Sequence, residues 1–282
     1  MDVLLWPGPY EAPSLILFDL ITSLSLISTS SPVILDGKVC SVRSRSIFSS
    51  TLNCSNGSYP THCEVKKNKK RLSRAERSNF IIETPLNEII VGLLLGDGHI
   101  QKRYINGNSR FMYSQSSLRV HHLNYFNHIL DLFRPYLSKE FKLKDRSFTD
   151  KKTNKIYRSV SFATLALPCF NDYRNLFYNS NNLKIVPSNI SNLLSPRGLA
   201  YWIMDDGSLQ NKGLHLNTYG FKIEDVLILK QTLENMFGES SLNCSIHKHQ
   251  KGHRIYIWEE SMVQVRNNIS KYMHKDMLYK IN

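Results

Sequence analysis

The sequence contains one short pattern twice: IVGLLLGDG at residues 90–98 is matched by LAYWIMDDG at residues 199–207. Each stretch is an apolar run that closes with aspartate and glycine. Thr84-Pro85 precedes the first run and Ser195-Pro196 precedes the second. Each run therefore has a hydroxyl N-cap, a proline at the first helical position and a glycine just past the end, which predicts two short helices.

Both predicted helices are apolar on nearly all sides, so we expect them to be buried between two halves of the molecule. Gly92 and Gly96 are four residues apart and share one face of the first helix. This spacing permits a partner helix to approach closely. The second helix offers Ala200 for the contact, but Tyr201 and Met204 make its packing face less suitable.

The sequence around the two helices also matches. In each half the helix is followed by a strand-like segment, an amphipathic helix, a further strand and a final helical stretch. The segments are 110–114, 123–133 and 157–164 in the first half, and 214–217, 224–237 and 254–258 in the second. We therefore predict an α+β protein of two pseudo-symmetric αββαββα repeats, at residues 65–184 and 185–282, after an N-terminal extension (residues 1–64) that is expected to be disordered.

The aspartates at the helix ends are the candidate catalytic residues. Asp97 and Asp206 lie where the helix dipole is negative, which disfavours an acidic side chain by about 0.3–1 kcal/mol. Parallel packing of the helices would bring both carboxylates together, and they would repel each other unless a cation bound there. Carboxylate oxygens without nearby His or Cys favour Mg²⁺ or Mn²⁺. Such a metal beside a basic surface is suited to phosphodiester hydrolysis. A lone Asp-Gly usually forms only a turn, but two in register favour catalysis.

The composition points to a polyanionic partner. The 36 Lys and Arg outnumber the 23 Asp and Glu, giving a net charge of +13 that suits either nucleic acid or an anionic membrane surface. A hydrophobic content of 41% excludes wholesale disorder. The best candidate for a membrane span, residues 15–27, is too short and contains Asp19, so we expect no membrane-spanning segment. The five cysteines form no Cys-x-x-Cys pair, which argues against a zinc site.

The two motifs resemble those of the single-chain LAGLIDADG homing endonucleases, and the branch encoded in organellar group I introns is the more similar. YMHKDMLYK at residues 272–280 resembles the C-terminus of that branch. The resemblance implies a monomer with pseudo-two-fold symmetry, whose sheets form a saddle that binds double-stranded DNA. It also implies metal-dependent cleavage of both strands and a location in the mitochondrion, with the chloroplast as the alternative.

The resemblance assigns roles to the motif residues. It implies that Asp97 and Asp206 are the catalytic metal ligands. Gly96 and Asp205, which precede them, could offer backbone carbonyls to the metal. The sixth motif position, which is often acidic in the family, is Leu95 and Met204 here; the metal role belongs to the eighth position, so this departure does not endanger activity.

Residues that face outward from the sheets are the candidates for reading DNA. Alternation places Val160, Phe162, Leu214 and Leu216 in the core. The predicted DNA-binding residues are Gln101, Arg103, Ser159, Ser161, Gln210, Lys212, His215, Asn217 and Arg254. Each could equally be an ordinary surface residue. Of the basic residues near the late strands, Arg254, Lys251, Lys155 and Arg158, one in each half could stabilise the transition state, and the sequence does not identify which.

Two other functions share these features. An RNA maturase that assists splicing of its own group I intron, with or without DNA cleavage, would need the same fold and basic surface. A transcriptional DNA-binding module would need the basic surface but not the paired acids. The presence of both aspartates favours the nuclease.

Overall fold

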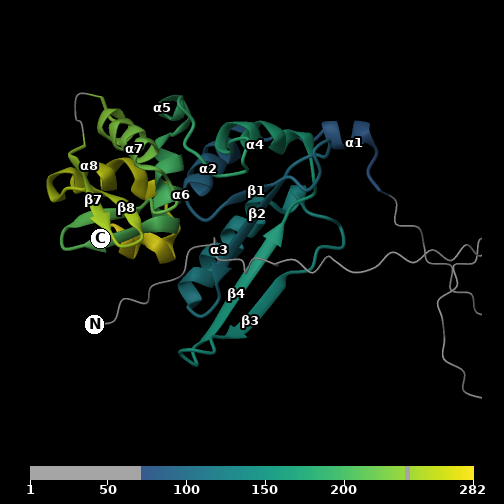
Figure 1. The fold of residues 1–282 in the computed structure, drawn as a ribbon, viewed down its shortest axis with the longest axis horizontal. Helices are drawn as coiled ribbons and strands as arrows, with labels where there is room; N and C mark the ends of the chain where they lie inside the picture. The colour runs from purple at the N-terminus through teal and green to yellow at the C-terminus, as the bar shows by residue number, and fades with distance from the viewer. Residues whose placement is uncertain (1–70, 239–241) are drawn as a thin grey trace, which may run out of the picture. The chain divides into compact units, whose positions relative to one another are not determined.

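The computed structural model describes residues 71–238 and 242–282, which belong to one compact unit (Figure 1). The predicted N-terminal extension (residues 1–64) lies outside the described residues. The helices are α1 (Arg74–Ser78), α2 (Thr84–Leu95), α3 (Val120–Leu132), α4 (Asn171–Phe177), α5 (Ile190–Leu193), α6 (Pro196–Asp206), α7 (Ile223–Asn235) and α8 (Glu259–Ile269). The strands are β1 (His99–Gln101), β2 (Arg110–Ser116), β3 (Lys144–Thr149), β4 (Ile156–Ala163), β5 (Gly207–Gln210), β6 (Gly213–Asn217), β7 (Cys244–His249) and β8 (Gly252–Ile257). Short 3₁₀ helices lie at Arg134–Tyr136 and Pro168–Phe170 in the first repeat, and at Ser270–Tyr272 and Lys275–Lys280 after α8.

The strands form two four-stranded antiparallel sheets of identical order, β1-β2-β4-β3 and β5-β6-β8-β7 (Figure 1). The elements of the first repeat run α2-β1-β2-α3-β3-β4-α4, and those of the second run α6-β5-β6-α7-β7-β8-α8. The predicted pair of αββαββα repeats is therefore confirmed. Within residues 71–238 and 242–282, no helix has the length and apolar character that a membrane span requires.

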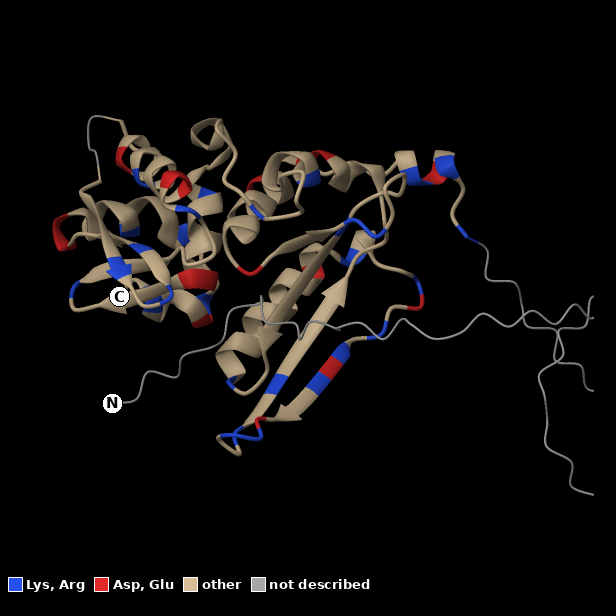
Figure 2. Ribbon diagram, in the orientation of Figure 1, with Lys and Arg blue, Asp and Glu red and all other residues tan. Residues whose placement is uncertain are grey.

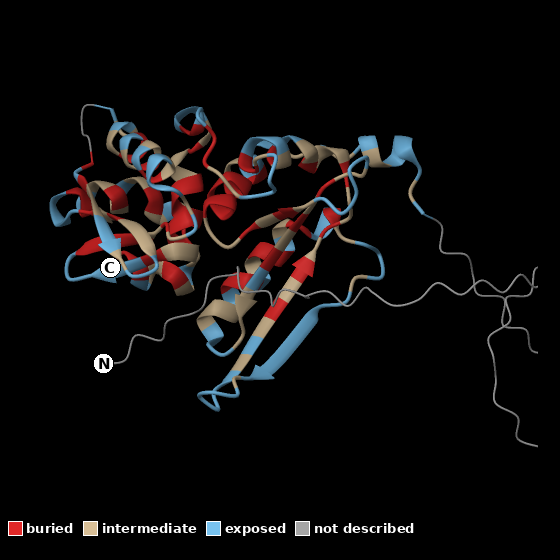
Figure 3. Ribbon diagram, in the orientation of Figure 1, coloured by how far each residue is buried: buried red, intermediate tan, exposed pale blue. Residues whose placement is uncertain are grey.

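Each sheet turns one face toward its helices. Val160, Phe162, Leu214 and Leu216 are buried on these inner faces, as the alternation predicts. Ser159 and Ser161 lie on the opposite face of β4 and are half-buried. The pale-blue length of β3 in Figure 3 shows that this strand extends beyond the core.

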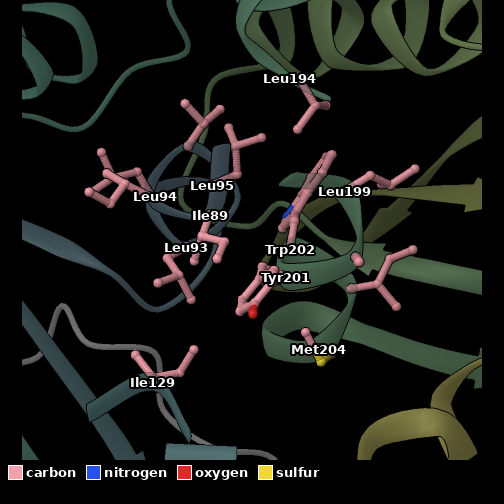
Figure 4. Close-up of a cluster of buried hydrophobic side chains, with 14 of the residues drawn as sticks. Ile89, Leu93, Leu94, Leu95, Ile129, Leu194, Leu199, Tyr201, Trp202 and Met204 are labelled. Carbon is pink, nitrogen blue, oxygen red and sulfur yellow. The ribbon is translucent and has the colours of Figure 1, made fainter. Parts of the chain in front are cut away.

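Helices α2 and α6 pack side by side, and the contact between them is mostly apolar (Figures 3 and 4). They approach so closely at Gly92 that a Cβ there would lie 2.0 Å from the carbonyl oxygen of Gly198. The residue opposite Gly92 is Gly198, which was not singled out from the sequence. Gly198, the residue immediately before the second motif, supplies the small residue because it lies where the helix backbones cross.

The two helices begin and end differently. Ser195 caps α6, since its Oγ accepts a 3.2 Å hydrogen bond from the Gly198 N–H. The same prediction for Thr84 was wrong, because Thr84 lies inside α2 and the N-cap is Glu83, whose side chain makes no capping bond. At the other end α2 stops at Leu95, whereas α6 continues through Asp206.

Candidate active site at the ends of the two motif helices

Three aspartates lie where α2 and α6 end. Asp97 lies just past α2, and Asp205 and Asp206 form the last turn of α6; all three residues are half-buried. Burial raises the pKa of each carboxyl group. Repulsion from Asp97 adds to this effect for the other two: the pKa of Asp205 rises to about 8, and that of Asp206 rises well above its ordinary value. The two motifs thus bring their acids into one electrostatically coupled cluster.

Two lysines, one from each repeat, bond to the backbone at these helix ends: Lys184 just past the end of α2 and Lys280 at the end of α6. The Nζ of Lys184 donates to the carbonyl oxygens of Gly96 at 2.8 Å and Gly98 at 3.0 Å. The Nζ of Lys280, which is 7% exposed, donates to the carbonyl oxygens of Asp205 at 2.9 Å and Met204. Burial lowers the pKa of both ammonium groups, to about 8 for Lys184, and attraction to the aspartates opposes the shift.

These lysines were not among the basic residues predicted for the site. Lys155, Arg158 and Lys251 are exposed side chains on late strands and turns. The sequence does carry a signal for the correct pair, because Leu183-Lys184-Ile185 in the first repeat matches Tyr279-Lys280-Ile281 in the second. Matching positions in two related repeats indicate matching roles.

The cluster has the donor chemistry of a divalent-cation site. Its three carboxylates exceed its two ammonium groups by one negative charge when all are ionised. Burial is the main cause of the raised carboxyl pKa values, and repulsion between the aspartates adds to it for Asp205 and Asp206. The carbonyls of Gly96 and Asp205 each accept a lysine hydrogen bond and keep a second lone pair. Among the described residues, no three His, Cys, Asp or Glu side chains form a metal-binding group by themselves. Phosphate oxygens and water would have to complete the coordination, as is usual for Mg²⁺.

Further hydrogen bonds join the aspartates to the first sheet. The Oδ1 of Asp205 accepts from the hydroxyl of Tyr113 at 2.8 Å, and its Oδ2 accepts from the N–H of Asp97 at 3.1 Å. The Nε2 of Gln115 donates to the Oδ2 of Asp97 at 3.4 Å. Burial raises the pKa of Tyr113 well above its ordinary value, so its hydroxyl remains a donor. Neither Tyr113 nor Gln115 was predicted, because nothing in the sequence distinguishes them from the other residues of β2.

In the first sheet, the side-chain amide of Gln101 joins two arginines. The Oε1 of Gln101, at the end of β1, accepts hydrogen bonds from the Nε of Arg103 at 3.3 Å and of Arg110 at 2.9 Å. Arg110 was not predicted, but its side chain lies on the same face as Gln101. Ser159 and Ser161 pair with Ser116 and Ser114 of β2 and share its outer face.

The second sheet places its predicted residues less uniformly. Gln210 is exposed at the end of β5, and Asn217 pairs with Arg254 across β6 and β8. Lys212 is exposed but forms a 3.0 Å ion pair with Glu259. His215 was expected to be open on the outer face, and this was wrong.

His215 does lie on the outer face of the second sheet, but it is only 4% exposed. The rings of His247 and Tyr256 cover it, with centroids 5.4 and 4.8 Å away. Its side chain thus packs among its neighbours on that face.

Basic side chains gather along the hairpin of β3 and β4, which is blue at its tip in Figure 2. Lys144 and Arg146 lie on the outer face of β3, opposite Ser161 and Ser159. Lys151, Lys152 and Lys155 follow in the exposed turn. The outer face of the first sheet is therefore polar and positively charged.

Comparison with known proteins identifies the family. The model of the LAGLIDADG DNA endonuclease family matches residues 87–265. The cytochrome b mRNA maturase bI2 of Saccharomyces cerevisiae is 32% identical over 206 residues, which cover 70% of this chain and 48% of that protein. This chain therefore spans about half the length of that relative. A probable intron-encoded endonuclease 1 of Wickerhamomyces canadensis is 32% identical over 206 residues, 69% of this chain and 82% of that protein.

A solved structure agrees with these matches. The homing endonuclease I-WcaI, bound to its DNA recognition sequence, superposes with a TM-score of 0.64 and is 26% identical, over 72% of this chain and 88% of that one. The family match extends over more than half of the chain and includes both motifs, the strands of both sheets and the three aspartates. The chain belongs to the LAGLIDADG DNA endonuclease family.

Proposed function

We propose that this chain is a site-specific homing endonuclease that hydrolyses both strands of double-stranded DNA. One observation carries the proposal: the carboxyl groups of Asp97 and Asp206, from different repeats, interact electrostatically in one cluster at the ends of the two motif helices. A DNA-binding module without chemistry has no need for this costly arrangement of like charges. The relatives named as intron-encoded endonucleases and the DNA-bound homologue support the same activity.

The metal that we propose is Mg²⁺, with Mn²⁺ as a substitute. Asp97 and Asp206 would hold it, with the carbonyls of Gly96 and Asp205 as further oxygen donors. A bound divalent cation would polarise the scissile phosphate and stabilise the leaving oxygen. Lys184 and Lys280 bring two positive charges to the same place, where they would stabilise negative charge that develops on the phosphate. Gln115, bonded to Asp97, orients that carboxylate.

The outer faces of the two sheets are the DNA surface that we propose. The first sheet offers the Gln101 and Arg110 pair, whose guanidinium is fixed by the amide and can donate to a guanine. Arg103, Ser159 and Ser161 accompany them. The second sheet offers Gln210, Lys212, Asn217 and Arg254, with His215 in a packing role. One chain supplies both half-sites, so we propose that it acts as a monomer with repeats at residues 65–184 and 185–282.

A second function has its own support. A 32% identical relative is named a cytochrome b mRNA maturase, which favours an additional role in the splicing of intron RNA. The same name favours an organellar location, and we propose the mitochondrion, with the chloroplast as the alternative. A splicing assay on the intron that encodes this chain separates the two activities, because a maturase without nuclease activity would splice the RNA and leave the DNA uncut.

The test of the nuclease uses the full chain and DNA that spans the intron-insertion site. With Mg²⁺ the wild type should linearise a plasmid that carries this site, and without metal it should not. Asp97→Asn and Asp206→Asn should each abolish double-strand cleavage yet retain DNA binding in Ca²⁺. Their thermal stability without metal should hold or rise, because each substitution removes repulsion from the cluster.

A matched control is Asp131→Asn, which changes an aspartate that is 61% exposed and paired with Arg134, and which should cut normally. If the aspartates serve only as turn residues, Asn will form the same turn and leave cleavage intact. Full cutting by either active-site variant would therefore refute the assignment.

A further inference from the structure

The two motifs are matched in sequence, but the structure holds their catalytic aspartates in different ways. Helix α6 includes Asp206 as its last residue, and the following Gly207 N–H still bonds to the Ile203 carbonyl. Helix α2 ends two motif positions earlier, at Leu95. Asp97 therefore stands outside its helix.

Asp205 compensates for this difference across the boundary between the repeats. Its Oδ2 accepts the N–H of Asp97 at 3.1 Å, and its Oδ1 accepts the hydroxyl of Tyr113 at 2.8 Å. Both donors belong to the first repeat, whereas Asp205 belongs to the second. The carboxylate thus fixes the backbone of Asp97 from the opposite side of the interface.

No reciprocal bond can form, because Gly96 occupies the position that matches Asp205. A Cβ at Gly96 would lie 2.6 Å from the Cβ of Asp205 and 2.7 Å from its Oδ2. Only glycine leaves room for the Asp205 side chain. The second repeat therefore supplies a side-chain acceptor to the backbone of the first through Asp205, and the first repeat provides no matching acceptor because Gly96 has no side chain.

We infer that Asp205 is a positioning residue for the Asp97 half of the active site alone, and that it makes the two strand-cutting halves unequal. This inference rests on the proposed nuclease function and deepens it. The hydrogen bonds to the Asp205 side chain position Asp97, while Asp206 is held by its own helix. Removing the Asp205 carboxylate should then slow the cutting of one strand and turn the enzyme toward nicking.

The experiment compares Asp205→Ala with Asp205→Asn on a plasmid that carries one target site, with each strand labelled separately. Alanine keeps the Cβ and the helix but removes the acceptor. It should slow one strand at least tenfold more than the other, so that nicked plasmid accumulates. The slowed strand should be the one that Asp97→Asn affects more than Asp206→Asn does. Asparagine still accepts a hydrogen bond from the Asp97 N–H, and its amide can donate to the Tyr113 oxygen. The two strands should therefore be cut at nearly equal rates in Asp205→Asn.

A second readout does not depend on DNA cleavage. Amide hydrogen exchange in the metal-free protein should accelerate at Asp97 at least tenfold in Asp205→Ala, with little change at Asp206 or in Asp205→Asn. Equal slowing of both strands, or unchanged exchange at Asp97, would overturn the inference. If the wild type leaves DNA uncut, the proposed nuclease function fails, and the exchange at Asp97 still decides whether Asp205 holds it.

Discussion

Lys280 illustrates how one side chain can join the core to the chemistry. Its ammonium group bonds the last carbonyls of α6 and neutralises part of the aspartate cluster. Lys280→Met should therefore destabilise the metal-free protein by about 3 kcal/mol, because it removes one of the two cations beside the half-buried carboxylates and leaves the carbonyls of Met204 and Asp205 without their donor. Chemical denaturation measures the loss. Lys212→Met removes an ion pair whose lysine is 77% exposed, and should change stability by less than about 1 kcal/mol; similar losses in both variants would contradict this account.

His215 makes the stability of the fold depend on pH. Burial first, then the charges of Arg254 and His247, lower its pKa to about 4 from an ordinary 6.5. A histidine with a lowered pKa stabilises the fold fully above pH 6.5, and this contribution is lost as the pH falls toward 4. Between pH 7 and pH 5 the melting temperature of the wild type should therefore fall relative to that of His215→Gln; the raised carboxyl pKa values of the aspartate cluster act in the opposite direction in both proteins and cancel in this comparison. His99 and His122 also have pKa values lowered to about 4, so His215→Gln should keep the part of the pH dependence that these two histidines cause. Identical pH profiles for wild type and variant would show that His215 does not contribute.

At the scale of the element, the crossing of α2 and α6 depends on two glycines that are unequal. A Cβ at Gly92 would meet the Gly198 carbonyl oxygen at 2.0 Å, whereas a Cβ at Gly198 would meet the Glu88 carbonyl oxygen at 3.0 Å. Gly92→Ala must push the helices apart, and an overpacked core of this kind costs about 1–3 kcal/mol or more. Gly198→Ala needs only a small shift, so it should be clearly more stable than Gly92→Ala in thermal unfolding.

The same comparison extends to activity. Separation of the helices also moves Asp97 away from Asp206, so Gly92→Ala should lose cleavage even at temperatures where it is folded. Circular dichroism at the assay temperature supplies the control for folding. The reverse order of stability, with Gly198→Ala the weaker variant, would show that the helices cross elsewhere.

At the scale of the whole molecule, the net charge predicts that DNA affinity falls steeply with salt concentration. The chain carries a net charge of +13, and basic side chains line the outer face of β3. Each neutralised phosphate contributes about 0.9 to the slope of log K against log salt, so binding should weaken steeply between about 50 and 200 mM salt. Fluorescence anisotropy with the proposed target site measures the slope. A slope near zero would show that the basic surface is not a DNA-binding surface.

The sequence by itself determined the repeat, the fold class and the two catalytic candidates. Local rules sufficed for these, because proline, glycine and alternating apolar residues fix elements through the backbone and through burial. Two Asp-Gly helix ends in register also marked the site, since a duplicated pattern is hard to explain by turn chemistry alone. The burial of Val160, Phe162, Leu214 and Leu216 follows from strand alternation in the same way.

Only the tertiary structure decided which partners surround those aspartates. Lys184 and Lys280 reach the site from segments far along the chain, and Asp205 meets Asp97 across the repeat boundary. The burial of His215 and the meeting of Gly92 with Gly198 depend in the same way on neighbours distant in sequence. Local patterns specify which element a residue joins and which face it occupies. They do not specify which residue lies opposite. That depends on how the elements pack against one another, such as the angle and depth at which α2 and α6 cross.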